Sequence, residues 1–159
     1  MDFLSVASSV AGLLLAAGKV IGFLCTMVDA PSTARDVLAE VQALQAIFRQ
    51  LDSFISAPNQ QSAARKSRIQ LHDLVVTLTD CVTTFSELEV ELKKLGAADS
   101  TWEKTKWAVK DKDIAKILRR LQMHKASLGL MLSIYSWFVY HPAFFRHLHS
   151  RIVRFCPSR

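Results

Sequence analysis

The sequence of 159 residues has few of the residues that mark loop-rich or cross-linked proteins. It holds five glycines and four prolines, too few for a β-sandwich or a collagen-like chain. Its three cysteines, Cys25, Cys81 and Cys156, are far apart and odd in number, which excludes a disulfide scaffold and indicates a reducing compartment. It has no G-x-S-x-G, no Walker P-loop and no H-E-x-x-H motif. We therefore expect a protein that is not an enzyme and that has no cofactor.

Hydrophobic residues make up half of the chain and charged residues 21%, which excludes disorder throughout and fits one domain. The formal net charge of +6 is unevenly divided. Residues 1–103 carry 8 Lys or Arg and 12 Asp or Glu, a net charge of −4. Residues 104–159 carry 12 and 2, a net charge of +10. The two parts therefore need separate explanations.

The most hydrophobic segment opens the chain. From Phe3 to Val28 the only charged residue is Lys19, and about 20 apolar residues suffice to cross a bilayer as a helix. Asp2 precedes the segment, where a secretory signal would carry positive charge. Apolar residues recur every three or four positions, which predicts an amphipathic helix with Lys19 and small residues on its opposite face. The apolar face consists of Phe3, Val6, Val10, Leu14, Ala17, Ile21, Leu24 and Val28.

Three hypotheses fit this helix. It packs in the core of a soluble bundle, it is a permanent single-pass anchor, or it is packed at rest and released to lipid. Gly18 and Gly22 form a G-x-x-x-G spacing that allows close helix approach in membranes, but one such match does not decide among the three.

The remaining chain repeats the same helical spacing, without a useful strand pattern. Helices are predicted from Thr33 to the break at Pro58 and over a third segment that ends at Gly96. A short fourth helix follows the capping residue Ser100, and a long one starts near Asp111. The prediction is an all-α, antiparallel bundle of four or five helices, with sequential helices as neighbours. The expected core is Val37, Val41, Leu44, Phe48, Leu51, Ile55, Leu71, Leu74, Leu78, Val82, Phe85, Leu88, Leu92, Leu95, Ile114, Leu118, Leu121, Leu128 and Leu132.

After residue 133 the pattern changes. Residues 134–159 are rich in aromatics, hold three His, four Arg and no acid, and contain Pro142, which interrupts a helix. We therefore expect a helical domain over residues 1–133 and an irregular, basic, aromatic tail over residues 134–159. The tail's side chains that could bind a metal are His141, His147, His149 and Cys156. An H-x-H pair points to opposite faces of a helix, so no metal site is predicted.

A cluster of basic residues follows Lys104. Four of them fall within two turns and are expected to share one side of the long helix. Either this side is a solvated face or it contacts an acidic surface, with anionic lipid favoured over nucleic acid because no base-reading module is present. The four residues are Lys112, Lys116, Arg119 and Arg120.

Three stretches, taken in order, resemble the HeLo-like N-terminal domains of fungal STAND receptors. Met1–Leu14 (MDFLSVASSVAGLL) resembles the start of these domains, and Ala34–Val41 (ARDVLAEV) resembles their second helix. Their closing pattern is similar to the segment from Trp102 to Trp107, then Asp113-Ile114, then Leu121–Leu128 (LQMHKASL). The resemblance covers about residues 1–133.

The resemblance implies a helical bundle that precedes a nucleotide-binding switch and a repeat sensor, neither of which is present in this sequence. Related HeLo domains target membranes in regulated cell death, innate immunity and heterokaryon incompatibility, with the N-terminal hydrophobic helix as the working part. The residues that would insert into the membrane by this analogy are Phe3, Leu4, Val6, Val10, Leu13, Leu14 and Ile21.

We therefore expect a membrane-directed effector or signalling module of fungal regulated cell death. Its segment 3–28 would leave the bundle, insert into an anionic inner leaflet and permeabilise it after homo-oligomerisation. The expected location is cytoplasmic, with conditional association with the inner face of the plasma membrane. The alternative is a soluble domain that docks other helical signalling domains and never touches lipid. Lys19 distinguishes the two, because it reaches solvent in a resting bundle and must snorkel or face a polar pore in a membrane.

Overall fold

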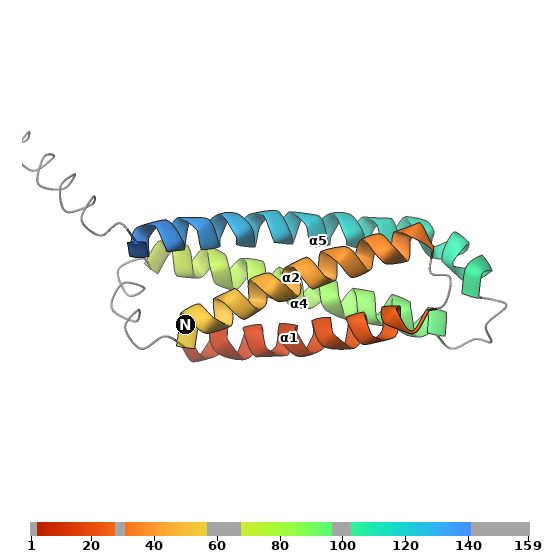
Figure 1. Cartoon of the computed structure of the whole chain (residues 1–159), viewed down its shortest axis with the longest axis horizontal. Coiled ribbons are helices and arrows are strands. Elements are labelled where there is room, and N and C mark those ends of the chain that lie inside the picture. Colours follow the sequence, from red (N-terminus) through yellow and green to blue (C-terminus); the bar gives the residue numbers. More distant parts are fainter. Residues whose placement is uncertain (1–2, 28–30, 57–67, 97–102, 141–159) are drawn as a thin grey trace, which may run out of the picture.

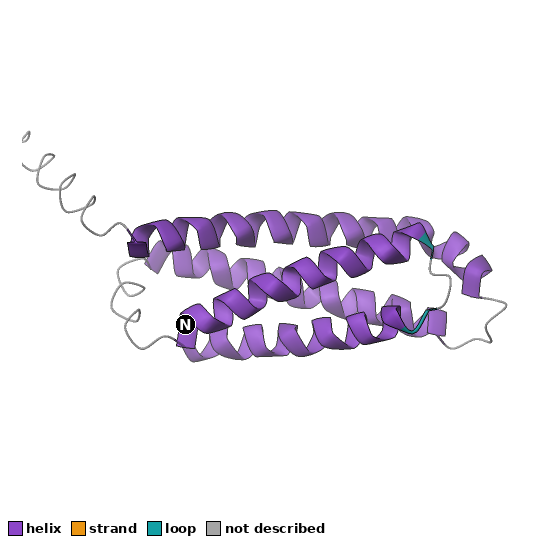
Figure 2. Cartoon of the chain, viewed as in Figure 1, coloured by secondary structure: helices purple, strands orange, loops and turns teal. Residues whose placement is uncertain are grey.

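The computed structural model describes residues 3–27, 31–56, 68–96 and 103–140. These residues form helices, with a short turn after the first one, and contain no strand (Figure 2). The all-α class is therefore confirmed. The helices are α1 (Phe3–Cys25), α2 (Ser32–Ser56), α4 (Arg68–Gly96) and α5 (Glu103–Tyr140).

The helices occupy the four corners of a bundle, and the chain direction alternates from each helix to the next (Figure 1). α1 packs against α2 and α4, and α5 packs against the same two helices. α1 and α5 therefore face each other across one diagonal, and α2 and α4 across the other. The prediction that sequential helices are neighbours is wrong for α2 and α4. Residues 57–67 lie between them, and a chain of this length can span to the diagonal corner.

Two phenylalanines meet across the second diagonal. The rings of Phe48 in α2 and Phe85 in α4 lie 6.1 Å apart at an interplanar angle of 58°. Both side chains are fully buried, and such tilted aromatic pairs contribute about 0.5–1.5 kcal/mol beyond their buried area. The pair thus links two helices that make few other contacts with each other.

Buried positions in α1, α2 and α4 alternate between steps of three and four, the repeat of supercoiled helices. Residues that follow this repeat keep facing a supercoiled neighbour. After two successive steps of four, the next residue points away from the neighbouring helix. The buried positions are Val6, Val10, Leu13, Ala17, Val20 and Leu24 in α1; Ala34, Val37, Val41, Leu44, Phe48 and Leu51 in α2; Leu74, Leu78, Cys81, Phe85, Leu88, Leu92 and Leu95 in α4; and Ile114, Ile117, Leu121, Leu128 and Leu132 in α5.

This strict alternation explains errors in the predicted core of α4 and α1. The predicted stripe of α4 ran from Leu78 to Val82, but Cys81 is buried and Val82 is 42% exposed. In α1 the strict repeat selects Leu13, so Leu14 is only partly buried. In α5 Ile117 is buried and Leu118 only partly buried, although steps of three and four fit either residue. Two more residues predicted to be in the core are only partly buried. They are Ile21, beside which Val20 is buried, and Ile55.

α5 is continuous where two helices were expected. No glycine or proline interrupts Glu103–Asp113, and the polar residues that suggested a second start lie on the flanks of one helix. The hydroxyl of Thr33 donates to Asp111 at 2.7 Å, and Lys110 pairs with Asp113 at 3.7 Å. The helix also continues past Ser133 to Tyr140. The predicted cap at Ser100 and the rest of the tail, residues 141–159 with its histidines and Cys156, lie outside the described residues.

The outward side of α1 is open. A Cβ atom built at Gly12 or Gly22 meets no neighbouring atom within 4 Å. Alanine is favoured over glycine by about 0.8–1.0 kcal/mol in a helix interior. We therefore expect Gly12→Ala and Gly22→Ala each to raise the free energy of unfolding by about 1 kcal/mol, measured by urea denaturation. Ala17→Leu, at a fully buried position, is the control and should lower it; a loss of stability in either glycine variant would show that this side is covered.

Candidate functional site

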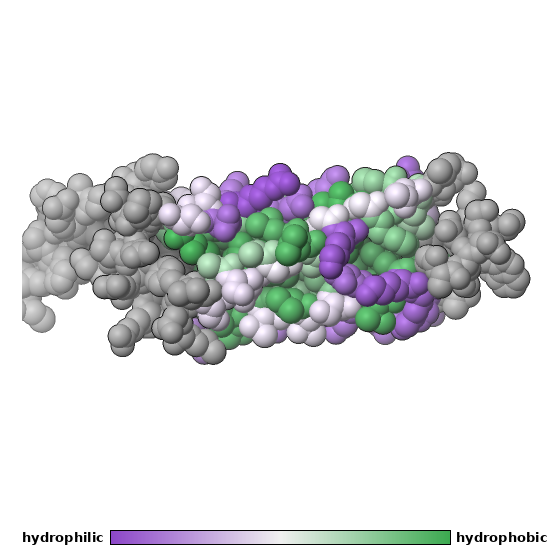
Figure 3. Space-filling view, turned by 90° about the horizontal axis from the view of Figure 1, so that it is seen from below, coloured by the Kyte–Doolittle hydropathy of each residue, from purple (hydrophilic) through white to green (hydrophobic). Residues whose placement is uncertain are grey.

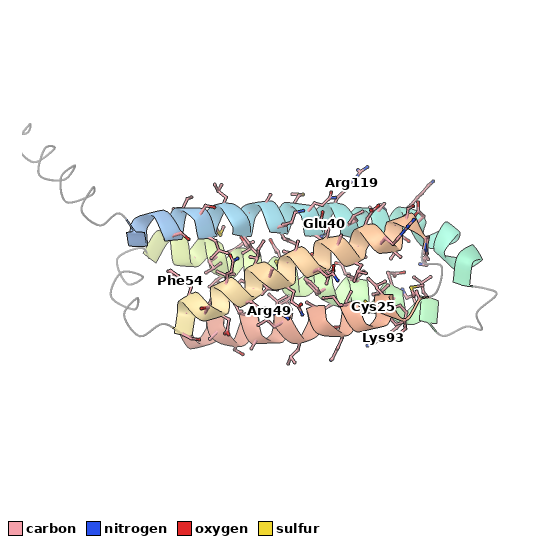
Figure 4. The ribbon with its side chains drawn as sticks, viewed as in Figure 1. Cys25, Glu40, Arg49, Phe54, Lys93 and Arg119 are labelled. Atoms are coloured by element: carbon pink, nitrogen blue, oxygen red, sulfur yellow. The ribbon has the colours of Figure 1, made fainter. Side chains whose placement is uncertain are left out.

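The polar bonds that join different helices in the described part of the chain all involve α5. On its α2 side, the ammonium group of Lys125 lies 2.6 Å from Oε2 and 2.9 Å from Oε1 of Glu40. The Glu40 side chain is 15% exposed, and Figure 4 shows it between α2 and α5. Together with the Thr33–Asp111 hydrogen bond, this ion pair fixes the register of the parallel helices α2 and α5.

The seam between α4 and α5 carries two further ion pairs. Arg120 pairs with Glu87, and Lys110 lies 3.1 Å from Oε2 of Glu91. Glu91 is only 16% exposed and also accepts a hydrogen bond from Lys94 at 2.6 Å. The hydrogen bond from Lys94 lowers the pKa of Glu91, and Lys110 adds to this effect against the opposing effect of burial. Two glutamates of α4 are thus part of an interhelical seam with α5.

A neutral polar bond completes the seam. Thr84 is fully buried, and its hydroxyl donates to the backbone oxygen of Asp80 at 2.9 Å. The same hydroxyl lies 2.9 Å from Nε2 of His124. Because the threonine hydroxyl has already donated its single proton to Asp80, it accepts a hydrogen bond here, and Nε2 of His124 is the donor. Burial lowers the pKa of His124, Asp80 opposes this shift and Arg120 adds to it. His124 thus joins α4 to α5.

α1 has no such bond to another helix among the described side chains. The hydroxyl of Ser9 donates within the helix, to the backbone oxygen of Ser5 at 2.9 Å. Lys19 is exposed, as expected for a resting bundle, and forms no ion pair with a described residue. The diagonal arrangement explains this, because α1 lies opposite α5, which carries the bundle's cross-linking cations. Apolar packing therefore holds α1 in place.

The predicted insertion residues face inward in this state. Val6, Val10 and Leu13 are at most 2% exposed, whereas Leu14 and Ile21 are partly buried against the core. The side chains of the other two predicted insertion residues, Phe3 and Leu4, lie outside the described set.

The outward side of α1 carries one large and well-exposed apolar residue. Leu15 is 70% exposed, in agreement with the prediction that it lies opposite the apolar face. Figure 3 views the bundle from the α1 side and shows hydrophobic and weakly polar residues along much of this face. Within the described helices, only Ser5–Cys25 is long and apolar enough to cross a membrane, judged by length and composition.

The predicted basic group is divided by the bundle. Lys112, Lys116 and Arg119 are exposed, and Figure 4 shows Arg119 projecting away from the helices. Lys116 lies 3.7 Å from Asp113 one turn earlier. Arg120 instead turns toward α4 and pairs with Glu87. Three of the four predicted cations therefore remain for an external partner.

The described helices hold no group of three or more His, Cys, Asp or Glu residues placed to bind a metal ion. Of their two cysteines, Cys25 is exposed and Cys81 is buried. Burial raises the pKa of the Cys81 thiol to about 12, so this thiol is protonated and unreactive near neutral pH.

Comparison with known proteins returns no relative. No protein-family model matches the chain, no curated protein matches it, and no solved structure matches it. The HeLo-like resemblance of the three stretches therefore stays a prediction, and the function must be inferred from the residues and their arrangement.

The seam gives a testable pH dependence. Because the fold lowers the pKa of His124, the unfolded chain binds more protons near the ordinary histidine pKa of 6.5, and stability rises with pH there. The contribution of His124 is complete above pH 6.5 and is lost as the pH falls through the pKa of the folded state. Thermal unfolding between pH 7.5 and pH 5 should show this loss, and His124→Gln should reduce it. His72→Gln, which changes an exposed histidine, is the control; an unchanged pH profile in His124→Gln would contradict the assignment.

Proposed function

We propose that this protein is a non-enzymatic, membrane-targeting effector or signalling module, of the kind that acts in fungal regulated cell death. α1 leaves the bundle and inserts into an anionic membrane, and the opened chains associate. The observation that carries this proposal is that α1 is apolar enough to span a bilayer and yet has no polar bond to α2, α4 or α5 among the described side chains.

Release of α1 moves its side chains from the apolar core of the bundle into the apolar interior of a membrane. In the bundle, α1 buries valines, alanine and leucines, each larger side chain contributing about 1.5–3 kcal/mol relative to water. A lipid interior offers the same side chains a comparable environment. Leu15, which is 70% exposed in the bundle, would gain burial on insertion. The described residues of α1 form no interhelical ion pair that would have to be broken or carried into the membrane.

The other three helices keep their links when α1 leaves. α2 and α5 stay joined by Glu40 and Lys125, and α4 and α5 by Glu87 and Arg120. The Phe48–Phe85 contact still joins α2 to α4. The apolar faces of α2 and α4 that α1 covered would need a new cover, and a second copy of the same chain supplies one. Homo-oligomerisation on activation follows from this exposure.

The alternative is a soluble interaction domain in which α1 remains an ordinary core helix. Its support is the near-complete burial of Val6, Val10 and Leu13. In that case helical signalling partners would bind the outer surface, and lipid would have no effect on the fold. A charge introduced on the exposed side of α1 distinguishes the two functions. It should prevent membrane insertion, and it should not affect a soluble interaction domain.

Leu15→Asp tests the proposal because it changes α1 without disturbing the core. The side chain is 70% exposed, so the bundle should fold as before, with an unchanged circular dichroism spectrum. An aspartate near the centre of a membrane helix costs about 2.5–3.5 kcal/mol. We therefore expect roughly 100-fold less dye release from phosphatidylserine-containing vesicles at equal protein concentration.

The matched control is Val90→Asp, which places the same charge at a 49% exposed site on α4. It should release dye as well as the unmodified protein. Equal dye release by Leu15→Asp, or no release by the unmodified protein under any lipid composition, would favour the soluble interaction domain.

A further inference from the structure

The outward face of α5 has two halves. Exposed residues recur along it at intervals that keep them on one side of the helix. The first half is basic and the second is apolar, and no acid lies among the exposed positions of this line. Its residues are Lys112, Lys116, Arg119, Met123, Leu130 and Ile134.

The cations in the first half are available to an external partner. Lys112 and Arg119 form no ion pair with a described residue, and Lys116 has only Asp113 at 3.7 Å. Two acids of neighbouring α4 are already paired with α5, because Glu87 binds Arg120 and Glu91 binds Lys110. Asp80 of α4 lies close enough to affect His124, but it faces the seam, and the three outward cations give the face itself a positive potential.

The apolar half is exposed to an unusual degree for a folded bundle. Met123 is 67% exposed, Leu130 64% and Ile134 37%. These side chains lie in a single line along the helix, which is narrower than the apolar centre of a protein–protein interface. Exposed apolar side chains in line with lysine and arginine are typical of helices that lie on a bilayer surface.

We propose that this face docks the folded bundle on an anionic lipid bilayer, before α1 leaves its place. From Lys112 to Ile134 the face is about 33 Å long at 1.5 Å per residue. Its residues form a straight line on a convex surface, so a flat membrane can contact all of them at once. The cations bind lipid headgroups, and the apolar side chains enter between them.

Docking through α5 has a geometric consequence for α1. The two helices lie on one diagonal of the bundle, so a bundle docked through α5 holds α1 on the side away from the membrane. α1 therefore cannot insert by sinking in place and must detach from the bundle first. This last step rests on the proposed function, whereas docking itself does not.

The test uses the full chain carrying Leu15→Asp, in which α1 cannot insert. Lys112→Ser with Arg119→Ser should weaken its binding to phosphatidylcholine vesicles that contain phosphatidylserine, measured by co-sedimentation. Each basic residue near an anionic surface contributes roughly a five-fold change in binding, so the pair should cause about a 25-fold loss. Met123→Ser with Leu130→Ser should weaken binding several-fold and leave its dependence on anionic lipid intact.

The charge-matched control removes two exposed cations from other helices, Arg49 in α2 and Lys93 in α4 (Figure 4). With Arg49→Ser and Lys93→Ser, binding should change less than two-fold. Raising the salt from about 0.1 M to about 1 M shortens the screening length from about 10 Å to about 3 Å and should release the docked protein. All six positions that are changed to serine are exposed.

The outcomes separate this inference from the proposed function. Equal losses in the Lys112/Arg119 and Arg49/Lys93 variants would overturn it and leave only a general charge effect. Equal binding to neutral and anionic vesicles would also overturn it and indicate an acidic protein as the occupant of this face. Neither result would affect the proposed insertion of α1. That proposal is supported separately if the unmodified protein releases dye and Leu15→Asp does not.

Discussion

The structure depends on α5 as the common partner of the polar side chains in the bundle. Glu40 in α2 and Glu87 and Glu91 in α4 all reach cations on this one helix. Part of the contrast between the acidic first part of the chain and its basic second part is therefore neutralised inside the fold. α1 lies on the opposite corner, beyond the reach of these cations. This placement of α5 links it to α2 and α4 by polar bonds. α1 is held by apolar contacts, which are not directional.

The packing reinforces this division. The largest buried side chains include Phe48 and Phe85, which meet across the bundle, whereas α1 contributes mainly valine, alanine and leucine. α1 thus closes a core whose centre is supplied by its neighbours. Its outward side carries Leu15 and open glycines. α1 thus differs from the other helices in having no polar bond to them among the described side chains. The outward face of α5 adds exposed cations and apolar side chains on the opposite corner of the bundle.

Much of the fold was predictable from the sequence, because apolar spacing marks a helix without knowledge of its neighbours. The bounds of α2 and its buried residues from Val37 to Leu51 agree with the prediction. Choices between adjacent residues, such as Cys81 against Val82, depend on the strict repeat imposed by supercoiled partners and were wrong. The apolar residues of α1 and the basic residues of α5 were identifiable by type, but the pairing of Arg120 with Glu87 required the topology. The division of charge between the two parts of the chain was the only sequence signal of the α5 seam, and it did not name the pairs.

The central claim is that α1 separates from the bundle at lower free energy than the other helices do. Native-state hydrogen exchange measures this directly, because each amide reports the free energy of the opening that exposes it. The account predicts that amides from Val10 to Val20 exchange through an opening of lower free energy than those from Val41 to Phe48 and from Leu78 to Leu88. The difference should widen when anionic vesicles are added. One shared opening free energy for all four helices, unchanged by vesicles, would contradict it.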